Sequence, residues 1–442
     1  MGKISEIIVI KNGIIVTMDK ELNWFRDGAV VVQNNKILDV DKTRKILKKY
    51  KGDIIIDAKN KAVMPGLINT HMHSGLLRGT GDDLPLYEWL SKYVHPAHKV
   101  LKPAEVYAAS MLSYSEAIKC GTTCVLDMHR FMDRSADAAG KLGIRAVLAP
   151  YVSDQLDYLE NFEDNKRLMR EKHRSFEDRI HVWCGLHSFR DCSPELLIEA
   201  REYARKYKVG LHTHSNESID DVELAKKMYG KRPLEHLFDY GIVGPNVVLA
   251  HCVWLSNTEI EIIRKTNTRV AHCPVANMKL ADGIAAIPKL LKKQIKVGLG
   301  SDGTVESNSF DLFQVMKFAT LLGRVHELGT NAMSADVTLK MATVNGAEVL
   351  GLNNEVGSIE VGKKADIILV NLRRLHLTPI LYGDYFNVIS HLVYATKGSD
   401  VDTVIVDGKI VMENRIIKRV DENKVIEKAQ ENAIELLRRI ST

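Results

Sequence analysis

The chain has 442 residues, which is enough for one large domain of barrel size and a smaller one beside it. Hydrophobic residues make up 45% and charged residues 26%, close to the average for globular proteins. No segment approaches the unbroken apolar run that a membrane helix needs, so we expect no membrane partner. The formal charge of +5 is dispersed, and the densest basic run, residues 42–51, holds a single aromatic residue for base stacking. We therefore expect no nucleic-acid partner either.

Two features predict a cytoplasmic location. Residues 1–12 alternate charged residues with Ile and Val, which is typical of an opening strand and not of a cleavable secretory signal. The six cysteines are scattered through apolar segments, without the dense spacing of a disulfide scaffold or a paired zinc site. Cys120 and Cys124 lie four residues apart, on either side of Gly-Thr-Thr, and we interpret both as core residues.

The two ends of the chain share one pattern. Apolar and polar residues alternate from about Ser5 to Ala62, with Asn-Gly and Asn-Asn at turn positions, which predicts antiparallel sheet. The alternation returns after Gly357. We therefore predict a small β-sandwich domain built from residues 1–64 and 356–420, followed by an amphipathic terminal helix over residues 421–442.

Short apolar runs alternate with helical stretches between these ends, over residues 65–355. The eight runs are VMPGLINTHMH, TTCVLDMH, IRAVLAPYV, IHVWCGLHS, VGLHTHS, NVVLAHCV, TRVAHCPV and KVGLGSDG. Parallel strands joined by crossover helices produce this alternation, and eight such units predict an α/β fold of the (β/α)8 TIM barrel type. Polar residues at the carboxyl ends of barrel strands face the active-site mouth.

Side chains that can bind a metal follow five of the eight runs. The first run ends in His71 and His73, which are two residues apart and therefore point to the same side of a strand. The other candidates are His212 with His214, His251, His272, and Ser301 with Asp302. A single histidine at a strand end is more often structural, but agreement among five strands favours a metal site. Imidazoles with one carboxylate suit zinc or ferrous iron, and a hydrolytic site keeps one coordination position open for water.

Two questions stay open at this point. His212 and His214 compete for one ligand position on the fifth run. Glu217 follows His214 by three residues, just beyond the strand and over the predicted barrel mouth. A carboxylate placed there suits proton transfer between activated water and substrate, and a solvated loop acid is the alternative.

The segments PGLINTHMH, HTHSNE, LAHC and LGSDG resemble the amidohydrolase superfamily. Within it they are similar to methylthioadenosine/S-adenosylhomocysteine deaminases and triazine chlorohydrolases, over nearly the whole chain. The resemblance implies one divalent ion, with zinc expected first and iron as the alternative. Its implied ligands are His71, His73, His214 and Asp302. It also implies that Glu217 protonates a ring nitrogen, and that His251 and Asp302 orient and deprotonate the attacking water.

The same resemblance implies a substrate pocket. His187 in GLHS matches a family histidine that contacts the substrate ring or sugar, whereas His212 falls where the family varies and is expected to be buried. Adenosine-type deaminases of this branch carry a Trp-Leu segment that leads through a proline to a glutamate for the ribose hydroxyls. Here the segment WLSKYVHPAH runs from Trp89 to His98, so the expected acid is missing.

A second departure follows the third run, where Pro150 stands in place of an arginine that those enzymes can carry for the far end of the nucleoside. We expect the substrate pocket to include Trp89, His98, Arg130, His187 and Arg190, with His95 and His129 near the same strand ends or on the first long loop. For the two arginines and for His95, His98 and His129, a position on the surface or behind the pocket wall is the alternative. These residues hint at a more polar or partly anionic substrate than a neutral nucleoside.

The sequence thus predicts a metal-dependent hydrolytic deaminase of an amino-substituted nitrogen heterocycle, such as an adenosine derivative, purine, pterin or triazine. A chlorohydrolase or another hydrolase of C–N or C–Cl bonds is an alternative with the same site. A non-catalytic metal-binding barrel protein is the alternative of another class, which Glu217 disfavours because it would then have no role. The residues leave open whether the chain forms a homodimer or a homotetramer.

Overall fold

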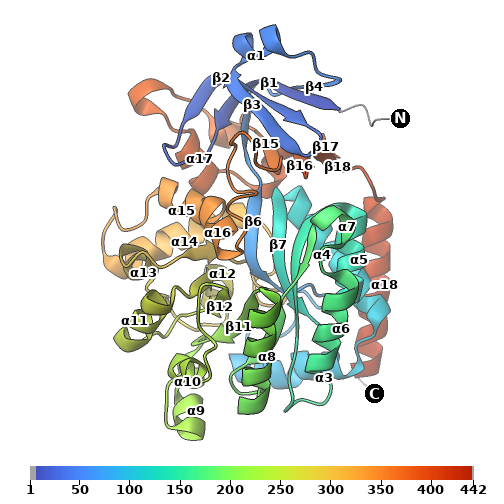
Figure 1. Cartoon of the computed structure of the whole chain (residues 1–442), viewed down its shortest axis with the longest axis vertical. Helices are drawn as coiled ribbons and strands as arrows, with labels where there is room; N and C mark the ends of the chain where they lie inside the picture. Colours follow the sequence, from blue (N-terminus) through green and yellow to red (C-terminus); the bar gives the residue numbers. More distant parts are fainter. Residues whose placement is uncertain (1–5, 441–442) are drawn as a thin grey trace.

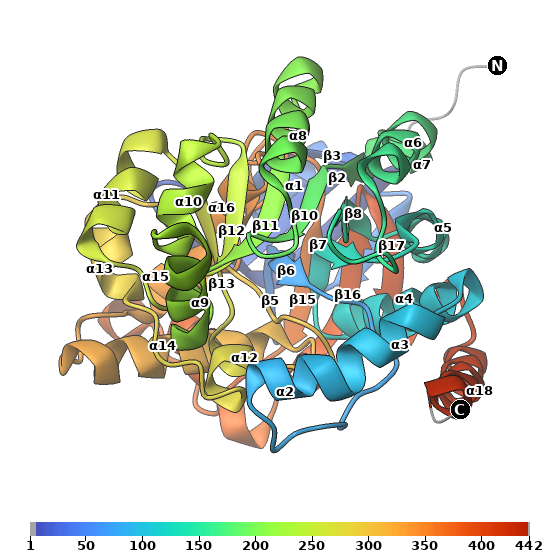
Figure 2. The same ribbon diagram turned by 90° about the horizontal axis from the view of Figure 1, so that it is seen from below.

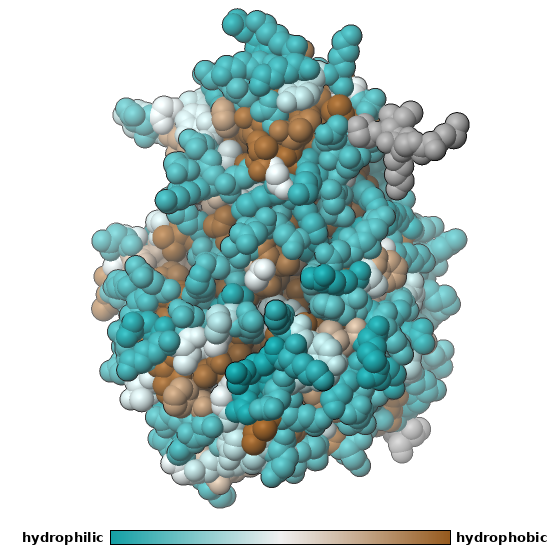
Figure 3. Space-filling model, viewed as in Figure 1, coloured by the Kyte–Doolittle hydropathy of each residue, from teal (hydrophilic) through white to brown (hydrophobic). Residues whose placement is uncertain are grey.

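The computed structural model describes residues 6–440 (Figure 1). Residues 1–5 of the predicted opening strand and residues 441–442 of the predicted terminal helix therefore lie outside the described residues. These described residues form three sheets: one mixed sheet of nine strands and two parallel sheets of four and five strands. The nine-stranded sheet forms the upper end of the molecule in Figure 1. Hydrophilic residues predominate on the face seen in Figure 3, with a hydrophobic group over that sheet. Among residues 6–440, no helix is long and apolar enough to cross a membrane.

The nine-stranded sheet joins both ends of the chain, as the alternating pattern predicts. Its strands are β1 (Ile7–Val16), β2 (Trp24–Gln33), β3 (Lys36–Lys42), β4 (Ile54–Asp57), β5 (Lys61–Pro65), β15 (Ile367–Asn371), β16 (Val401–Val406), β17 (Lys409–Glu413) and β18 (Ile416–Ile417). The path runs β18-β17-β16-β15-β5-β1-β2-β3, with β4 beside β1, and the antiparallel pair β15 and β5 connects the two chain ends. Both faces of β2 are buried: Val30 packs into one core, and Val31 packs on the opposite face with Ile46 of α1 (Thr43–Lys49).

All eight predicted runs contain parallel strands. The four-stranded sheet holds β6 (Leu67–Met72), β7 (Thr122–His129), β8 (Arg145–Pro150) and β9 (Ile180–Val182). The five-stranded sheet holds β10 (Cys184–Ser188), β11 (Leu211–Ser215), β12 (Val247–His251), β13 (Arg269–His272) and β14 (Val297–Leu299). The fourth run divides into β9 and β10, with only Trp183 between them. At the other edge, Thr70 Oγ1 of β6 donates to the Leu299 carbonyl of β14 at 2.9 Å. The strands, ringed by helices in Figure 2, form a TIM-barrel-type α/β fold.

Helices connect the parallel strands as far as β14, and α14 to α18 follow that last parallel strand. Those before residue 240 are α2 (Leu86–Trp89), α3 (His95–Val100), α4 (Pro103–Lys119), α5 (Met132–Leu142), α6 (Phe162–Lys172), α7 (Ser175–Asp178), α8 (Pro194–Tyr207), α9 (Ile219–Tyr229) and α10 (Pro233–Asp239). Those after it are α11 (Asn257–Thr266), α12 (Pro274–Lys279), α13 (Ile287–Lys292), α14 (Leu312–Glu327), α15 (Ala335–Met341), α16 (Val344–Val349), α17 (Val388–Tyr394) and α18 (Glu422–Ile440). Short helical turns are the π-helix η1 (Leu90–Val94), η2 (Leu375–Leu377), η3 (Gly383–Tyr385) and η4 (Gly398–Asp400).

Serine caps explain where several of these helices begin. The hydroxyls of Ser193, Ser218, Ser256 and Ser334 accept hydrogen bonds from the backbone amide three residues later, at the starts of α8, α9, α11 and α15. The terminal helix α18 packs against α4 and buries Leu436. The first long loop expected after β6 is partly helical, since it contains α2, η1 and α3. All six cysteines are free; Cys124 is buried as expected, and Cys120 is only partly buried.

A buried ion pair links β8 to the nine-stranded sheet. Arg145 is completely buried, and its Nε and Nη2 atoms each donate to the Asp366 carboxylate at 3.1 Å. The carboxylate of Asp407 lies 3.7 Å from the same Nη2. The backbone amide of Asp407 donates to Asp366 Oδ1 at 2.8 Å. The four-stranded sheet and the nine-stranded sheet are therefore joined by one buried cluster of charged side chains.

Arg145→Met is expected to lower the free energy of unfolding by about 3–5 kcal/mol, because it leaves the Asp366 carboxylate buried without its cation. Urea denaturation followed by circular dichroism measures the change. Arg167→Met, which removes an exposed arginine paired with Asp164, is the control and is expected to cost at most about 1 kcal/mol. Equal stability of the two variants would show that the buried pair does not hold the sheets together.

Candidate metal and catalytic site

Four histidines and one aspartate converge at the carboxyl ends of the parallel strands. His71 belongs to β6 and His73 follows it, His214 belongs to β11, His251 ends β12, and Asp302 follows β14. The Nε2 atoms of His73 and His214 are 3.3 Å apart. Asp302 Oδ1 lies 3.6 Å from His71 Nε2 and 3.4 Å from His73 Nε2. Two overlapping groups, His71 with His73 and His214, and His71 with His251 and Asp302, each place their candidate ligand atoms within 4.8 Å of one another.

The Nδ1 atom of each histidine has a partner outside this centre. The partners are His212 Nε2 for His71 at 2.8 Å, the Met128 carbonyl for His73 at 2.6 Å, the His187 carbonyl for His214 at 2.6 Å, and Asn277 Oδ1 for His251 at 2.9 Å. Such partners fix the ring orientation and the tautomer, so that Nε2 faces inward with a lone pair available for a cation.

The structure separates the roles of His212 and His214. His212 is completely buried, and its Nδ1 contacts the Val248 carbonyl at 2.9 Å. Because a carbonyl only accepts, this Nδ1 carries the proton, and His212 Nε2 accepts from His71 Nδ1. His71 Nε2 is then an unprotonated, buried nitrogen, and it has no hydrogen-bond partner among residues 6–440. A cation at the centre would satisfy this atom.

The electrostatics of the centre also fit a divalent ion. Burial lowers the pKa of His71, His73 and His214, so these imidazoles are neutral, which is the form that binds metals. Asp302 adds one carboxylate to the set. Imidazole nitrogen with a single carboxylate suits zinc or ferrous iron.

Glu217 lies beyond β11 beside this centre, with its Oε1 atom 3.6 Å from His251 Nε2. Burial raises the pKa of Glu217 well above its ordinary value, and the nearby carboxylates of Asp221 and Asp302 act in the same direction. The backbone amide of Glu217 donates to Asp221 Oδ2 at 3.1 Å, which anchors the turn before α9. A protonated carboxyl in this place is suited to general acid catalysis.

Backbone conformation contributes to the placement of these groups. Asn216, His251 and Asp302 have φ angles of 54°, 69° and 63°. These values lie in the left-handed region, which costs residues other than glycine on the order of 1–3 kcal/mol and is concentrated at functional sites. The turns at the strand ends therefore aim Glu217, His251 and Asp302 toward one point.

A pocket opens beside the centre, and we call it the metal-side pocket. It is lined by His73, Leu86, Trp89, Leu90, Val94, Tyr151, His187, Ser188, Phe189, Arg190, His214, Glu217, Asp221, His251, Asp302 and Glu306. Three of the predicted substrate residues, Trp89, His187 and Arg190, are therefore at the site. His187 Nδ1 contacts Asp191 Oδ2 at 2.7 Å, and the Arg190 guanidinium lies over the ring of Tyr87, 4.9 Å from its centroid.

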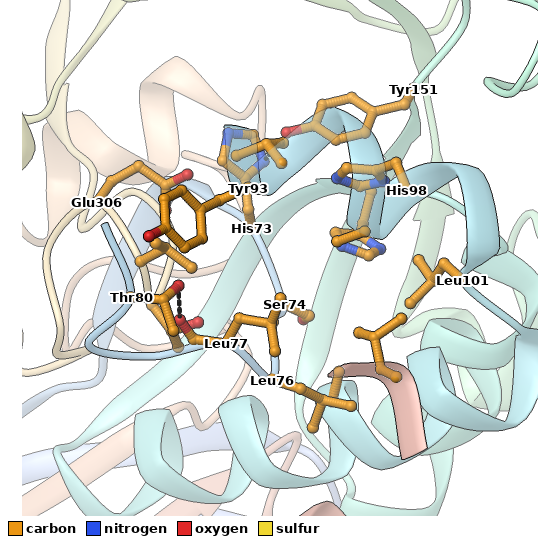
Figure 4. Close-up of a pocket in the computed structure, with 18 of the residues that line it drawn as sticks. His73, Ser74, Leu76, Leu77, Thr80, Tyr93, His98, Leu101, Tyr151 and Glu306 are labelled. Atoms are coloured by element: carbon orange, nitrogen blue, oxygen red, sulfur yellow. Dashed lines mark hydrogen bonds between the residues drawn. The ribbon is translucent and has the colours of Figure 1, made fainter. Parts of the chain in front are cut away.

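The other two predicted substrate residues lie elsewhere. His98 lines a second pocket, which we call the annex (Figure 4). The annex is lined by His73, Ser74, Gly75, Leu76, Leu77, Thr80, Trp89, Tyr93, Val94, Ala97, His98, Leu101, Ala109, His129, Tyr151, Thr304, Val305, Glu306 and Leu436. Arg130 lines neither of these two pockets, because its side chain turns to the His98 carbonyl and lies 3.5 Å from Glu160 Oε1. The position of Arg130 directly after a strand indicated a pocket residue, but the direction of its side chain depends on Glu160, which is remote in sequence.

Tyr151 and Glu306 line both pockets and were not predicted from the sequence. The Tyr151 hydroxyl lies 3.0 Å from His73 Nδ1, and its place at the end of the third apolar run was a usable signal. Glu306 follows Asp302 by four residues in the loop after β14. Burial and the Asp302 charge raise the pKa of Glu306 to about 8. An acid so soon after LGSDG was the signal in this case.

Neutral imidazoles and one carboxylate at the carboxyl ends of parallel strands, with an acid beside them, define a metal-dependent hydrolase of TIM-barrel-type fold. The chain belongs to the amidohydrolase family, whose model matches residues 62–411, and it is thus a hydrolase of carbon–nitrogen bonds. The family resemblance seen in the sequence motifs is confirmed.

Similar proteins cover almost the whole chain. A 5'-deoxyadenosine deaminase from Methanosarcina acetivorans is 42% identical over 98% of this chain and 99% of its own length. A 5-methylthioadenosine/S-adenosylhomocysteine deaminase from Thermoanaerobacter pseudethanolicus is 38% identical over 98% of this chain and 100% of its own length. The crystal structure of an adenosine deaminase from Xanthomonas campestris with bound zinc matches with a TM-score of 0.93 and 28% identity, covering 97% of this chain and 98% of that one.

Proposed function

We propose that this protein hydrolytically deaminates an adenosine derivative, replacing the ring amino group by oxygen and releasing ammonia. The observation that carries the proposal is Glu217, whose carboxyl has a raised pKa and lies 3.6 Å from His251, beside a cluster of inward-facing imidazole nitrogens. A purely metal-storing protein has no use for such an acid. The relatives named as deaminases of 5'-deoxyadenosine and of methylthioadenosine support the substrate class.

The ligands of a single divalent ion are proposed to be His71, His73, His214 and Asp302, with zinc preferred and iron as the alternative. The unpartnered Nε2 atom of His71 supports this set, and so does the zinc bound to the similar adenosine deaminase. A divalent ion held there would supply Lewis acidity, which lowers the pKa of water toward neutrality.

The chain's own residues then move the protons. Glu217 donates a proton to the ring nitrogen next to the carbon under attack. His251 Nε2 lies between Glu217 Oε1 at 3.6 Å and Asp302 Oδ2 at 3.9 Å, where it orients the attacking water. Asp302 accepts one proton from that water and passes it to the amino group, which leaves as ammonia. The proton that remains on the attached oxygen returns to the Glu217 carboxylate as the ring carbonyl forms, so the acid is restored. Trp89, His187 and Arg190 are proposed to hold the ring.

We also propose domain boundaries for the chain. The two parallel sheets are proposed to close into one (β/α)8 barrel over residues 65–355, supported by the hydrogen bond from Thr70 to Leu299. The nine-stranded sheet is proposed to be a β-sandwich domain of residues 1–64 and 356–420, supported by the pairing of β5 with β15. A separate terminal helix is proposed for residues 421–442, supported by α18 (Glu422–Ile440). A cytoplasmic location and a homodimer or homotetramer stay predictions.

The direct test is ammonia release by the zinc-loaded protein. The panel contains 5'-deoxyadenosine, methylthioadenosine, S-adenosylhomocysteine, adenosine, guanine and an aminotriazine, and product masses identify the group that is lost. We expect stoichiometric ammonia and the corresponding inosine derivative from at least one adenosine derivative. Silence on the whole panel would refute the proposed reaction.

Substitution of His212 tests the support of the metal site. His212→Leu removes the acceptor for His71 Nδ1, and we expect zinc affinity to fall by about 10- to 100-fold. His212→Gln, whose amide oxygen still accepts, is expected to lose less. Competition with a chromogenic chelator measures the dissociation constants, and His236→Leu removes a buried imidazole on α10 as the control. Unchanged affinity in His212→Leu would contradict this role.

A further inference from the structure

The annex continues from the metal-side pocket. The two pockets share His73, Trp89, Val94, Tyr151 and Glu306. Beyond these shared residues, the annex wall is largely apolar and includes Leu76, Leu77, Ala97, Leu101 and, from the terminal helix α18, Leu436. A heterocycle beside the metal centre therefore has space for a substituent that extends into the annex.

Three polar atoms of the annex wall lack a partner. Glu306 Oε2, Thr304 Oγ1 and His98 Nδ1 are buried atoms with no hydrogen bond to any of residues 6–440. In the view of Figure 4, Glu306 lies on the opposite side of the pocket from His98. Buried donors and acceptors that stay unpaired are costly, so these atoms indicate a ligand with hydrogen-bonding groups.

The loop that carries Glu306 is held in place. Lys279 Nζ donates to the Val305 carbonyl at 2.5 Å, and the Ser307 amide donates to the Gly303 carbonyl at 3.0 Å. A Cβ atom on Gly303 would stand 2.1 Å from Glu306 Oε2 and 3.1 Å from His73 Cβ. The absence of a side chain at residue 303 thus leaves room for the Glu306 carboxyl beside His73.

Glu306 is not part of the metal set, since the groups whose ligand atoms lie within 4.8 Å do not include it. No lysine or arginine among the described residues lines the annex. Lys279, whose charge acts on Glu306, is paired with Asp82 at 2.6 Å. A substituent with a carboxylate would therefore lack a cation here, whereas an uncharged substituent with hydroxyl groups matches the unpaired atoms.

We propose that Glu306 and Thr304 bind hydroxyl groups of an uncharged glycosyl substituent on the heterocycle and thereby determine the preference for a nucleoside over its free base. Glu306 Oε2 accepts from one hydroxyl of a vicinal diol, and Thr304 Oγ1 pairs with the second. The apolar wall around Leu76 and Leu101 then contacts the remainder of the substituent. This inference rests on the proposed function, which it deepens by assigning specificity-determining residues.

The test compares 5'-deoxyadenosine, which carries the diol, with 2',3',5'-trideoxyadenosine, which lacks it. Glu306→Ala is expected to lower kcat/KM for 5'-deoxyadenosine by about 10- to 100-fold, mainly through KM, and to change the trideoxy value by less than about threefold. Thr304→Val is expected to act in the same direction with a smaller loss. Circular dichroism and zinc content report whether each variant stays folded and loaded.

Asp282→Asn is the matched control. Like Glu306, Asp282 is a buried carboxyl with one oxygen that has no hydrogen-bond partner among residues 6–440, and it interacts electrostatically with Glu217 and Asp302. Unlike Glu306, it lines neither pocket. We expect it to alter both substrates equally. An equal loss on both substrates in Glu306→Ala would overturn the proposal, because that residue would then act through the metal centre.

Binding measurements separate this inference from the proposed reaction. If the wild-type protein releases no ammonia from any adenine derivative, the proposed function fails. Calorimetry with 5'-deoxyadenosine and the trideoxy analogue then tests the contact alone. The wild-type protein should bind 5'-deoxyadenosine more tightly than the trideoxy analogue, by about 10- to 100-fold in the dissociation constant. In Glu306→Ala the two dissociation constants should be similar. The same preference in both proteins would overturn the proposal.

Discussion

Glu217→Gln is expected to reduce kcat by about 10³-fold while the zinc content of the protein stays unchanged. The substitution keeps the size of the side chain and its place above the centre, but an amide does not deliver the proton that the ring nitrogen needs. Glu217 is absent from the groups that could hold the ion, so its loss leaves His71, His73 and His214 together. Steady-state ammonia release with a saturating adenosine derivative, combined with elemental analysis, measures both quantities.

Glu223→Gln is the control for this experiment. Glu223 is an exposed residue of the same helix, α9, and its substitution is expected to leave kcat within about twofold of the wild-type value. If Glu217→Gln kept more than about a tenth of the wild-type kcat with a full complement of zinc, the general-acid assignment would be wrong.

His214→Ala is expected to abolish stoichiometric zinc binding and to lower activity by about 10³-fold or more, since the catalytic water then keeps a pKa far above neutrality. The His214 Nε2 atom lies 3.3 Å from His73 Nε2, and its Nδ1 is held by the His187 carbonyl, so no neighbouring side chain replaces it without a change of the β11 strand. Elemental analysis and the ammonia assay report the two losses. Removal of the ion from the wild-type protein with a chelator should have the same effect on activity, reversed by one equivalent of zinc.

His326→Ala, which removes a partly exposed imidazole on α14, is the control and should keep both zinc and activity. Retention of one zinc per chain and of wild-type turnover in His214→Ala would reject the ligand set. His212 would then have to supply the nitrogen, in conflict with its hydrogen bonds to Val248 and His71.

Local patterns in the sequence determined much of the architecture. The apolar residues of the chain ends form strands such as β1 and β2, as predicted. Alternate side chains of a strand face opposite sides, and β2 buries consecutive residues because Val30 and Val31 pack into cores on opposite faces. The eight apolar runs became the parallel strands, and the spacing of His71 and His73 placed both imidazoles on one side. These features depend on residues that are close in sequence, so they are readable without the fold.

The tertiary structure alone decided how side chains at the strand ends are used. His212 and His214 share a strand and a side-chain direction, yet only contacts with Val248 and His187, from neighbouring strands, separate the buried support from the inward-facing nitrogen. The same holds for Arg130, which turns to Glu160.

Glu306 follows β14 and Tyr151 follows β8, and the fold brings both residues into the lining of the two pockets. Sequence patterns report which face of an element is apolar, and thus where the core lies. They do not report hydrogen bonds between segments that are distant in sequence, nor the positive φ angles that turn His251 and Asp302 toward the centre. Such hydrogen bonds and φ angles depend on the packing of the whole chain. For that reason the local pattern of apolar residues determined the scaffold of this protein, whereas the assembled tertiary structure determined its site.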